Sequence, residues 1–125
     1  MSTLKVGIAT YDEMKALTMA VARGDRKLGP QEPRVWFPST ESFAKVLSAE
    51  NRALLRVIAE KAPESLDELA ELTGRKKSNL SRTLKTMAIY GLVRLERGVR
   101  GRIAAKVLHD RIELELPLGL AEFAA

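Results

Sequence analysis

The chain contains no cysteine, a single histidine and no apolar run of the roughly 18 residues that a membrane-spanning helix needs. Without cysteine, neither disulfide bonds nor thiolate-ligated metals are available. The N-terminus has no basic stretch followed by an apolar run, so we expect no signal peptide. Because 46% of the 125 residues are hydrophobic, we predict a single compact cytoplasmic domain with at most a short appendage and no membrane partner.

Catalytic and metal-binding patterns are also missing. His109 has no accompanying cluster of Asp, Glu or His at ligand spacing, so we expect no metal site. There is no local support for a Ser/His/Asp triad and no glycine-rich loop that would cradle a phosphate. Glu68 and Glu71 fit the solvated face of a short helix. We therefore expect no cofactor and no enzymatic activity.

What the chain does have is positive charge concentrated in one segment. Residues 75–106 carry ten basic side chains and one acidic side chain, a net charge of +9. The whole chain carries +5, so the remainder is −4. One basic block on an otherwise acidic protein is typical of a surface that binds a polyanion. A solvated basic face is the alternative. A membrane surface is disfavoured because these residues fall on a predicted helix and a predicted hairpin together.

Residues 1–47 are predicted to form a strand–helix–strand–helix extension. Residues 4–9 alternate apolar and small or polar side chains, which predicts a strand. Thr10 and Glu13 form a capping box that opens a helix. Its apolar stripe consists of Met14, Leu17 and Val21. After an exposed loop over 24–33, residues 34–37 form a second strand that is suited to pair with 4–9, and Ser39 opens another helix.

Residues 48–116 contain three predicted helices followed by strands. Ser48 caps the first helix, and Ser65 with Glu68 forms a capping box for the second, which ends at Gly74. The third runs from about Lys77 to Tyr90. Its buried face is Leu80, Leu84, Met87 and Ala88. Strands follow over 92–97 and 102–107, with Gly98 and Gly101 at the turn between them, and a last strand covers 111–116. Residues 117–125 remain as a C-terminal tail.

With that apolar face buried, the opposite face of the third helix points outward. It carries Lys77, Ser78, Asn79, Ser81, Arg82 and Lys85. Arg pairs with guanine acceptors and Asn with adenine, so we predict that Asn79, Ser81 and Arg82 contact or approach bases. Lys77, Ser78 and Lys85 are predicted to hold phosphates. Lys76 occupies the expected N-cap, where Ser, Thr, Asn or Asp is usual, and joins the predicted DNA-binding set. The alternative is that Ser78 serves as the N-cap, which would shift the helix start and rotate these assignments slightly.

The predicted hairpin adds a second basic surface. Arg94, Arg97, Arg100 and Arg102 lie on it, and a glycine-containing hairpin of this kind can lie along the DNA backbone. We place Arg100 and Arg102 ahead of the other two for DNA contact. The alternative is a charged, exposed hairpin without a ligand. Trp36, in the strand over 34–37, is expected to pack rather than to stack on bases.

Together these segments resemble a known family. ENRALLRVIAE, SLDELAELTGRKKSNLSRTLKTM and YGLVRLERG are similar to winged helix-turn-helix regulators of the broad MarR/ArsR type. The likeness is closer to small prokaryotic DNA-binding proteins of the HVO_A0114 type, whose bacterial members share a lead-in like VWFPSTESFAKVLS. It covers nearly the whole chain. Some of these proteins are the antitoxins of TumE/TumA-type toxin–antitoxin modules.

The resemblance implies an α+β fold: a winged helix-turn-helix over 48–116 with the N-terminal extension over 1–47. It also implies an antitoxin that binds its own operator in double-stranded DNA as a transcriptional repressor and neutralises a cognate toxin. The extension, with a net charge of +2, is assigned to homodimerisation slightly ahead of toxin contact. A stand-alone regulator that responds to a small molecule and a protein–protein adaptor remain alternatives.

Overall fold

The computed structural model describes residues 2–118 and shows a mixed α+β chain. Five helices and five strands occur in this part of the chain. They are β1 (Thr3–Ile8), α1 (Tyr11–Ala22), β2 (Val35–Phe37), α2 (Thr40–Val46), α3 (Ala49–Lys61), α4 (Leu66–Thr73), α5 (Lys77–Ile89), β3 (Val93–Arg97), β4 (Ile103–Val107) and β5 (Arg111–Glu115). A short 3-10 turn, η1 (Val99–Gly101), joins β3 to β4. The predicted order of helices and strands is confirmed.

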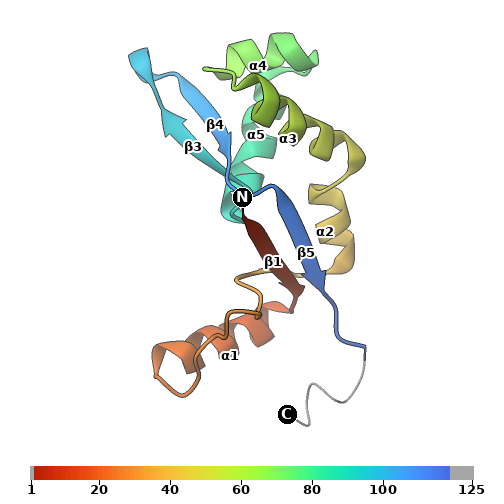
Figure 1. Ribbon diagram of the computed structural model, residues 1–125, viewed down its shortest axis with the longest axis vertical. Helices are drawn as coiled ribbons and strands as arrows, with labels where there is room; N and C mark the ends of the chain where they lie inside the picture. Colours follow the sequence, from red (N-terminus) through yellow and green to blue (C-terminus); the bar gives the residue numbers. More distant parts are fainter. Residues whose placement is uncertain (1, 119–125) are drawn as a thin grey trace.

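Two small sheets organise these elements (Figure 1). β3 and β4 form an antiparallel hairpin. The other sheet has the order β2-β1-β5, and both of its pairs are parallel. The predicted pairing of the first two strands is confirmed, with Val6 opposite Val35. The partner of β5 was not predicted: Arg111 lies opposite Thr3, so the end of the described chain pairs with its beginning.

Residues 1–47 and residues 48–116 contribute to one hydrophobic core. Leu4, Val6 and Phe37 belong to the same buried cluster as Leu54, Leu80 and other residues of α3 to β4. The Phe37 ring stacks on Tyr90 at 4.1 Å between centroids and meets Phe43 edge-on at 5.2 Å. The division between residues 47 and 48 stays a sequence-based prediction, and the described residues on both sides of it share this core. Most of the predicted tail, residues 119–125, lies outside the described residues.

The starts of α1 to α4 follow from capping chemistry. The side chains of Thr10, Ser39, Ser48 and Ser65 each accept a backbone N–H from the first turn of the helix that follows. Thr10 and Glu13 form the predicted reciprocal box. The predicted capping box of Ser65 and Glu68 is half right: the Ser65 side chain accepts the Glu68 N–H, but the Glu68 side chain does not return to the Ser65 N–H. The Glu68 carboxylate accepts the Glu64 N–H at 3.0 Å, one residue before the N-cap, because the chain turns back there after Pro63.

The apolar stripe of α1 is only partly covered. No residue of α1 is buried: Met14 and Leu17 are half-buried, and Val21 is exposed. Figure 1 shows α1 extending from the end of the sheet, away from the other helices. An open cavity, rather than packed side chains, lies between Leu17 and the Trp36 indole. The amphipathic helix predicted here is present, but within residues 2–118 no second layer covers its apolar stripe.

Candidate nucleic-acid interface

The turn between α4 and α5 sets the direction of α5. Gly74 takes a left-handed conformation with φ of 75°, where a residue without Cβ is favoured, and ends α4. Lys76 is the N-cap of α5 and makes no side-chain cap hydrogen bond. The helix therefore begins at Lys77, and the alternative assignment of Ser78 as the N-cap is wrong. Because no side chain caps it, this helix end offers N–H groups to an anionic ligand.

The buried face of α5 determines what its other face presents. Leu80, Leu84 and Met87 are almost completely inaccessible to solvent, as the spacing predicted, and Ala88 is partly buried beside them. The predicted contact residues on the rest of the helix start are exposed, namely Lys76, Lys77, Ser78, Asn79, Arg82 and Lys85. Ser81 differs, since it is half-buried on the flank of the helix. The outward surface is therefore polar and basic, with Arg82 opposite the buried residues.

The β3–β4 hairpin presents the second set of arginines. Arg97 closes the ladder opposite Ile103, and η1 with Gly98 and Gly101 forms the tip. Arg100 has φ of 60°, so the turn holds it in the left-handed region. Arg97, Arg100 and Arg102 are exposed and form no ion pair within residues 2–118. Arg94 is set apart because its guanidinium pairs with Glu96 at 2.7 Å.

Figure 1 shows where these two surfaces lie. The tip of the hairpin and α4 occupy one end of the molecule, and α1 occupies the other. Lys77 at the start of α5 forms an exposed ion pair with Asp67 of α4 at 3.1 Å. Such exposed pairs contribute little to stability, about 0–1 kcal/mol, so Lys77 can exchange Asp67 for another anion at small cost.

Arg75 has a structural role that sequence reasoning missed. It belongs to the basic segment, but its half-buried guanidinium donates to the Glu50 carbonyl at 2.8 Å and to Asn51 Oδ1 at 3.1 Å. The Asn51 amide in turn donates to the Val46 carbonyl at 3.0 Å. Arg75 thereby ties the turn before α5 to the start of α3 and, through Asn51, to the last residue of α2. A count of charges cannot separate such a side chain from one that is free to bind a ligand.

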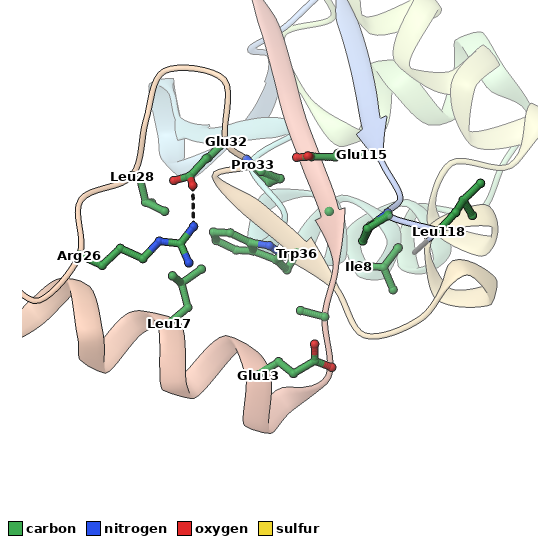
Figure 2. A pocket seen from close by; sticks show the side chains of 13 residues that line it. Ile8, Glu13, Leu17, Arg26, Leu28, Glu32, Pro33, Trp36, Glu115 and Leu118 are labelled. Atoms are coloured by element: carbon green, nitrogen blue, oxygen red, sulfur yellow. Dashed lines mark hydrogen bonds and ion pairs between the residues drawn. The ribbon is translucent and has the colours of Figure 1, made fainter. Parts of the chain in front are cut away.

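Two of the larger hollows in the described part of the chain lie outside this basic surface. One has a volume of about 570 Å³. Figure 2 shows that the Trp36 indole lies in it beside Leu17, Leu28 and the Arg26–Glu32 ion pair. The Gly29 N–H and then Arg26 bind the Glu32 carboxylate and hold the pKa of Glu32 below its usual value. A larger groove of about 800 Å³ has mostly apolar walls from α2, α3, β4 and the start of β5, including Phe43, Leu47 and Leu55. Neither hollow contains any of the predicted DNA-contact residues.

The described residues were also expected to contain no metal site and no membrane-spanning helix. Among residues 2–118, no three His, Asp or Glu side chains converge as a metal site would require. The His109 ring is instead engaged by its Nδ1, which lies 2.8 Å from the Ser2 hydroxyl. None of the helices in this part of the chain has the length and apolarity to cross a membrane.

A protein-family model, HVO_A0114, matches residues 46–114. The chain belongs to the HVO_A0114 family. The match covers more than half of the chain, from the last residue of α2 into β5, and so contains both basic surfaces. No curated protein and no solved structure matches the chain. The family name states no activity, so the functional conclusion must come from the arrangement of the residues.

Proposed function

We propose that residues 48–116 form a winged helix-turn-helix domain that binds double-stranded DNA. In this proposal α4 and α5 are the helix-turn-helix, α5 enters the major groove, and the β3–β4 hairpin is the wing. One observation carries the proposal. The exposed face at the start of α5 and the tip of the hairpin gather the basic side chains, while Leu80, Leu84 and Met87 fix α5 in the core.

The residue types on each surface indicate a division of roles. Asn79 and Arg82 are exposed on α5 and have the donor and acceptor geometry that reads base edges, with half-buried Ser81 beside them. Exposed Lys76, Lys77, Ser78 and Lys85 surround them and suit phosphate oxygens. On the wing, Arg97, Arg100 and Arg102 are placed to follow the backbone or enter a narrow minor groove. Arg94 is weaker in this role because Glu96 already binds it.

We further propose that this DNA binding serves autoregulation. The resemblance to antitoxins of TumE/TumA-type modules supports a cytoplasmic, dimeric antitoxin that represses its own operon and neutralises a cognate toxin. The basic surface lies on α5 and the hairpin, which leaves α1, none of whose residues is buried, available to a protein partner.

The test is binding of the purified full chain to the DNA immediately upstream of its own gene. Binding is measured by fluorescence anisotropy at 50 and 200 mM salt, with a scrambled duplex of the same composition as control. We expect preference for the upstream duplex and a steep loss of affinity with salt, because each neutralised phosphate adds about −0.9 to the slope of log K against log salt. Equal, weak binding to both duplexes at low salt would contradict the proposal.

The apolar groove favours a second candidate function, a regulator that responds to a small molecule. Its volume of about 800 Å³ lies within the range of ligand sites, and Arg52, Arg56 and Arg111 line it alongside the apolar residues. These arginines suit an apolar molecule with an acidic group. A panel of aromatic and aliphatic carboxylates is the probe. A member that raises the melting temperature and releases bound DNA would favour this candidate over the antitoxin.

A further inference from the structure

The three-stranded sheet has two edges of very different character. β1 lies in the middle, so β2 and β5 are the edge strands. β2 has only three residues, and Pro33 and Pro38 flank it closely. Short strands and prolines are devices that prevent further strand pairing. β5 has five residues, no proline within it and none directly next to it, since Pro117 comes two residues after Glu115; β1 is its only partner among the described strands.

The sequence of β5 is complementary to itself when read in the opposite direction. The strand reads Arg-Ile-Glu-Leu-Glu from Arg111 to Glu115. In an antiparallel pair centred on Glu113, Arg111 of one copy faces Glu115 of the other, and the same contact occurs twice by symmetry. Ile112 faces Leu114 of the other copy, also twice. Opposite charges and apolar pairs at directly facing positions stabilise antiparallel strands.

We propose that β5 pairs antiparallel with β5 of a second copy, in the register centred on Glu113, and so joins two three-stranded sheets into one of six strands. The sequence had suggested that residues 1–47 form the dimer interface. This contact places the interface on β5 instead. It does not rest on the proposed DNA binding, because it uses no residue of α5 or of the hairpin.

The pattern of burial on the inner face of the sheet favours a second β5 strand as the partner. Leu4 lies opposite Ile112 and Val6 opposite Leu114, so these side chains share the face that packs on the core. Leu4 and Val6 are buried, but Leu114 remains 37% exposed because nothing lies beyond it in the sheet. A second β5 places Ile112 of the other copy next to Leu114 and continues the apolar row.

On the outer face, the two Glu113 side chains meet at the symmetry axis. Each is already neutralised within its own chain, because Lys5 Nζ lies 2.9 Å from Glu113 Oε2. This hydrogen bond also keeps the pKa of the Glu113 carboxyl below its usual value. The row of side chains across the interface therefore runs Lys5, Glu113, Glu113 and Lys5, and its charges sum to zero.

Other registers are poorer. A pair centred on Leu114 sets Glu113 against Glu115 and loses both Arg111 contacts. A pair centred on Ile112 keeps an Arg111–Glu113 contact but overlaps only three residues of each strand. A shift by one residue sets apolar side chains against charged ones. The charges on β5 thus destabilise the other registers as well as stabilising the one centred on Glu113.

The proposed contact lies apart from the proposed DNA surface. In Figure 1 β5 lies beside β1 in the part of the molecule away from the tip of the hairpin and α4. Self-pairing through β5 uses a strand that contains none of the predicted DNA-contact residues.

The test is a charge exchange across the strand, read without DNA. Sedimentation equilibrium over a concentration series is run on the full chain and on Arg111→Glu, Glu115→Arg and the double variant. Each single variant sets like charges face to face at two positions, and we expect its dimer dissociation constant to rise about tenfold or more. The double variant restores opposite charges and should recover dimerisation. Glu60→Arg, an exposed change on α3, makes the same change in net charge as Glu115→Arg and should have no effect.

A second variant tests the register directly. The chain has no cysteine, so Glu113→Cys introduces one thiol, at the proposed axis. Directly opposed Cβ atoms lie about 4.5–5.5 Å apart, near the separation that a disulfide spans. Mild oxidation should give a covalent dimer, whereas Glu60→Cys should not. A monomeric parent chain, single variants that dimerise like the parent, or no cross-link at residue 113 would each overturn the proposal.

Discussion

Replacement of Arg82 by Ala should weaken operator binding without weakening the fold. Arg82 is exposed on the face of α5 opposite Leu80, Leu84 and Met87. Only its backbone carbonyl has a hydrogen-bond partner outside the helix ladder, the Thr86 hydroxyl at 3.2 Å, and that contact survives in the variant. Since Ala is an excellent helix former, the free energy of unfolding should change by less than about 0.5 kcal/mol.

The loss on DNA is set by the contact that the guanidinium makes. A bidentate arginine–guanine contact is worth about 1–3 kcal/mol, so the dissociation constant for the operator should rise about 5- to 150-fold. Preference over a scrambled duplex should fall with it. If Arg82 instead holds only a phosphate, both duplexes lose affinity equally, and the slope of log K against log salt falls by about 1.

Fluorescence anisotropy on both duplexes, at two salt concentrations, distinguishes these cases. Arg56→Ala is the matched control, because Arg56 is also an exposed helical arginine but lies on α3, outside the basic segment. Thermal melts of both variants verify that the fold is retained. Equal affinity of Arg82→Ala and Arg56→Ala for the operator would refute our placement of α5 in the major groove.

Three further predictions concern the fold. Leu84→Ala empties a buried position of α5 and should cost about 2–5 kcal/mol in urea unfolding. Gly7→Ala would bring a Cβ to 3.0 Å from Trp36 Cδ1, so it should shift the tryptophan emission and cost about 1–3 kcal/mol; an unchanged spectrum would contradict this packing. The pKa of Glu32 is lowered on folding, so the ionised carboxylate adds to the free energy of unfolding. This contribution is complete above about pH 4.3, the pKa in the unfolded chain, and is lost as the pH falls through the pKa in the folded protein. Glu32→Gln should therefore flatten the acid side of the stability profile, as melts between pH 2 and 6 would show.

Local chemistry made much of this fold predictable. Each serine or threonine that was assigned as an N-cap accepts the expected N–H, because that contact depends on residues three apart in sequence. The apolar spacing of Leu80, Leu84 and Met87 likewise determined the exposed face of α5. The predicted exposure of Lys76 to Asn79 and of Arg82 follows from the same periodicity.

What escaped prediction depends on contacts between distant residues. Periodicity identified β5 as a strand but carries no information on its partner, and a parallel pair with β1 has no turn that would reveal it. The stripe of α1 has the pattern of a buried face, but burial also requires a neighbour that the pattern cannot supply. Arg75 resembles its basic neighbours in the sequence, and only the carbonyl of Glu50 distinguishes it.

The pairing of β1 with β5 also determines when the molecule can finish folding during synthesis. Lys5 and Glu113 are 108 positions apart. At about 5–20 residues per second, a ribosome needs on the order of 5–20 s to produce β5 after β1. Meanwhile β1 has only β2 beside it, and the flank that β5 will cover stays open in the nascent chain. Residues of α3 to β4 emerge earlier and make many contacts with one another, so these contacts can form before β5 is available to pair with β1.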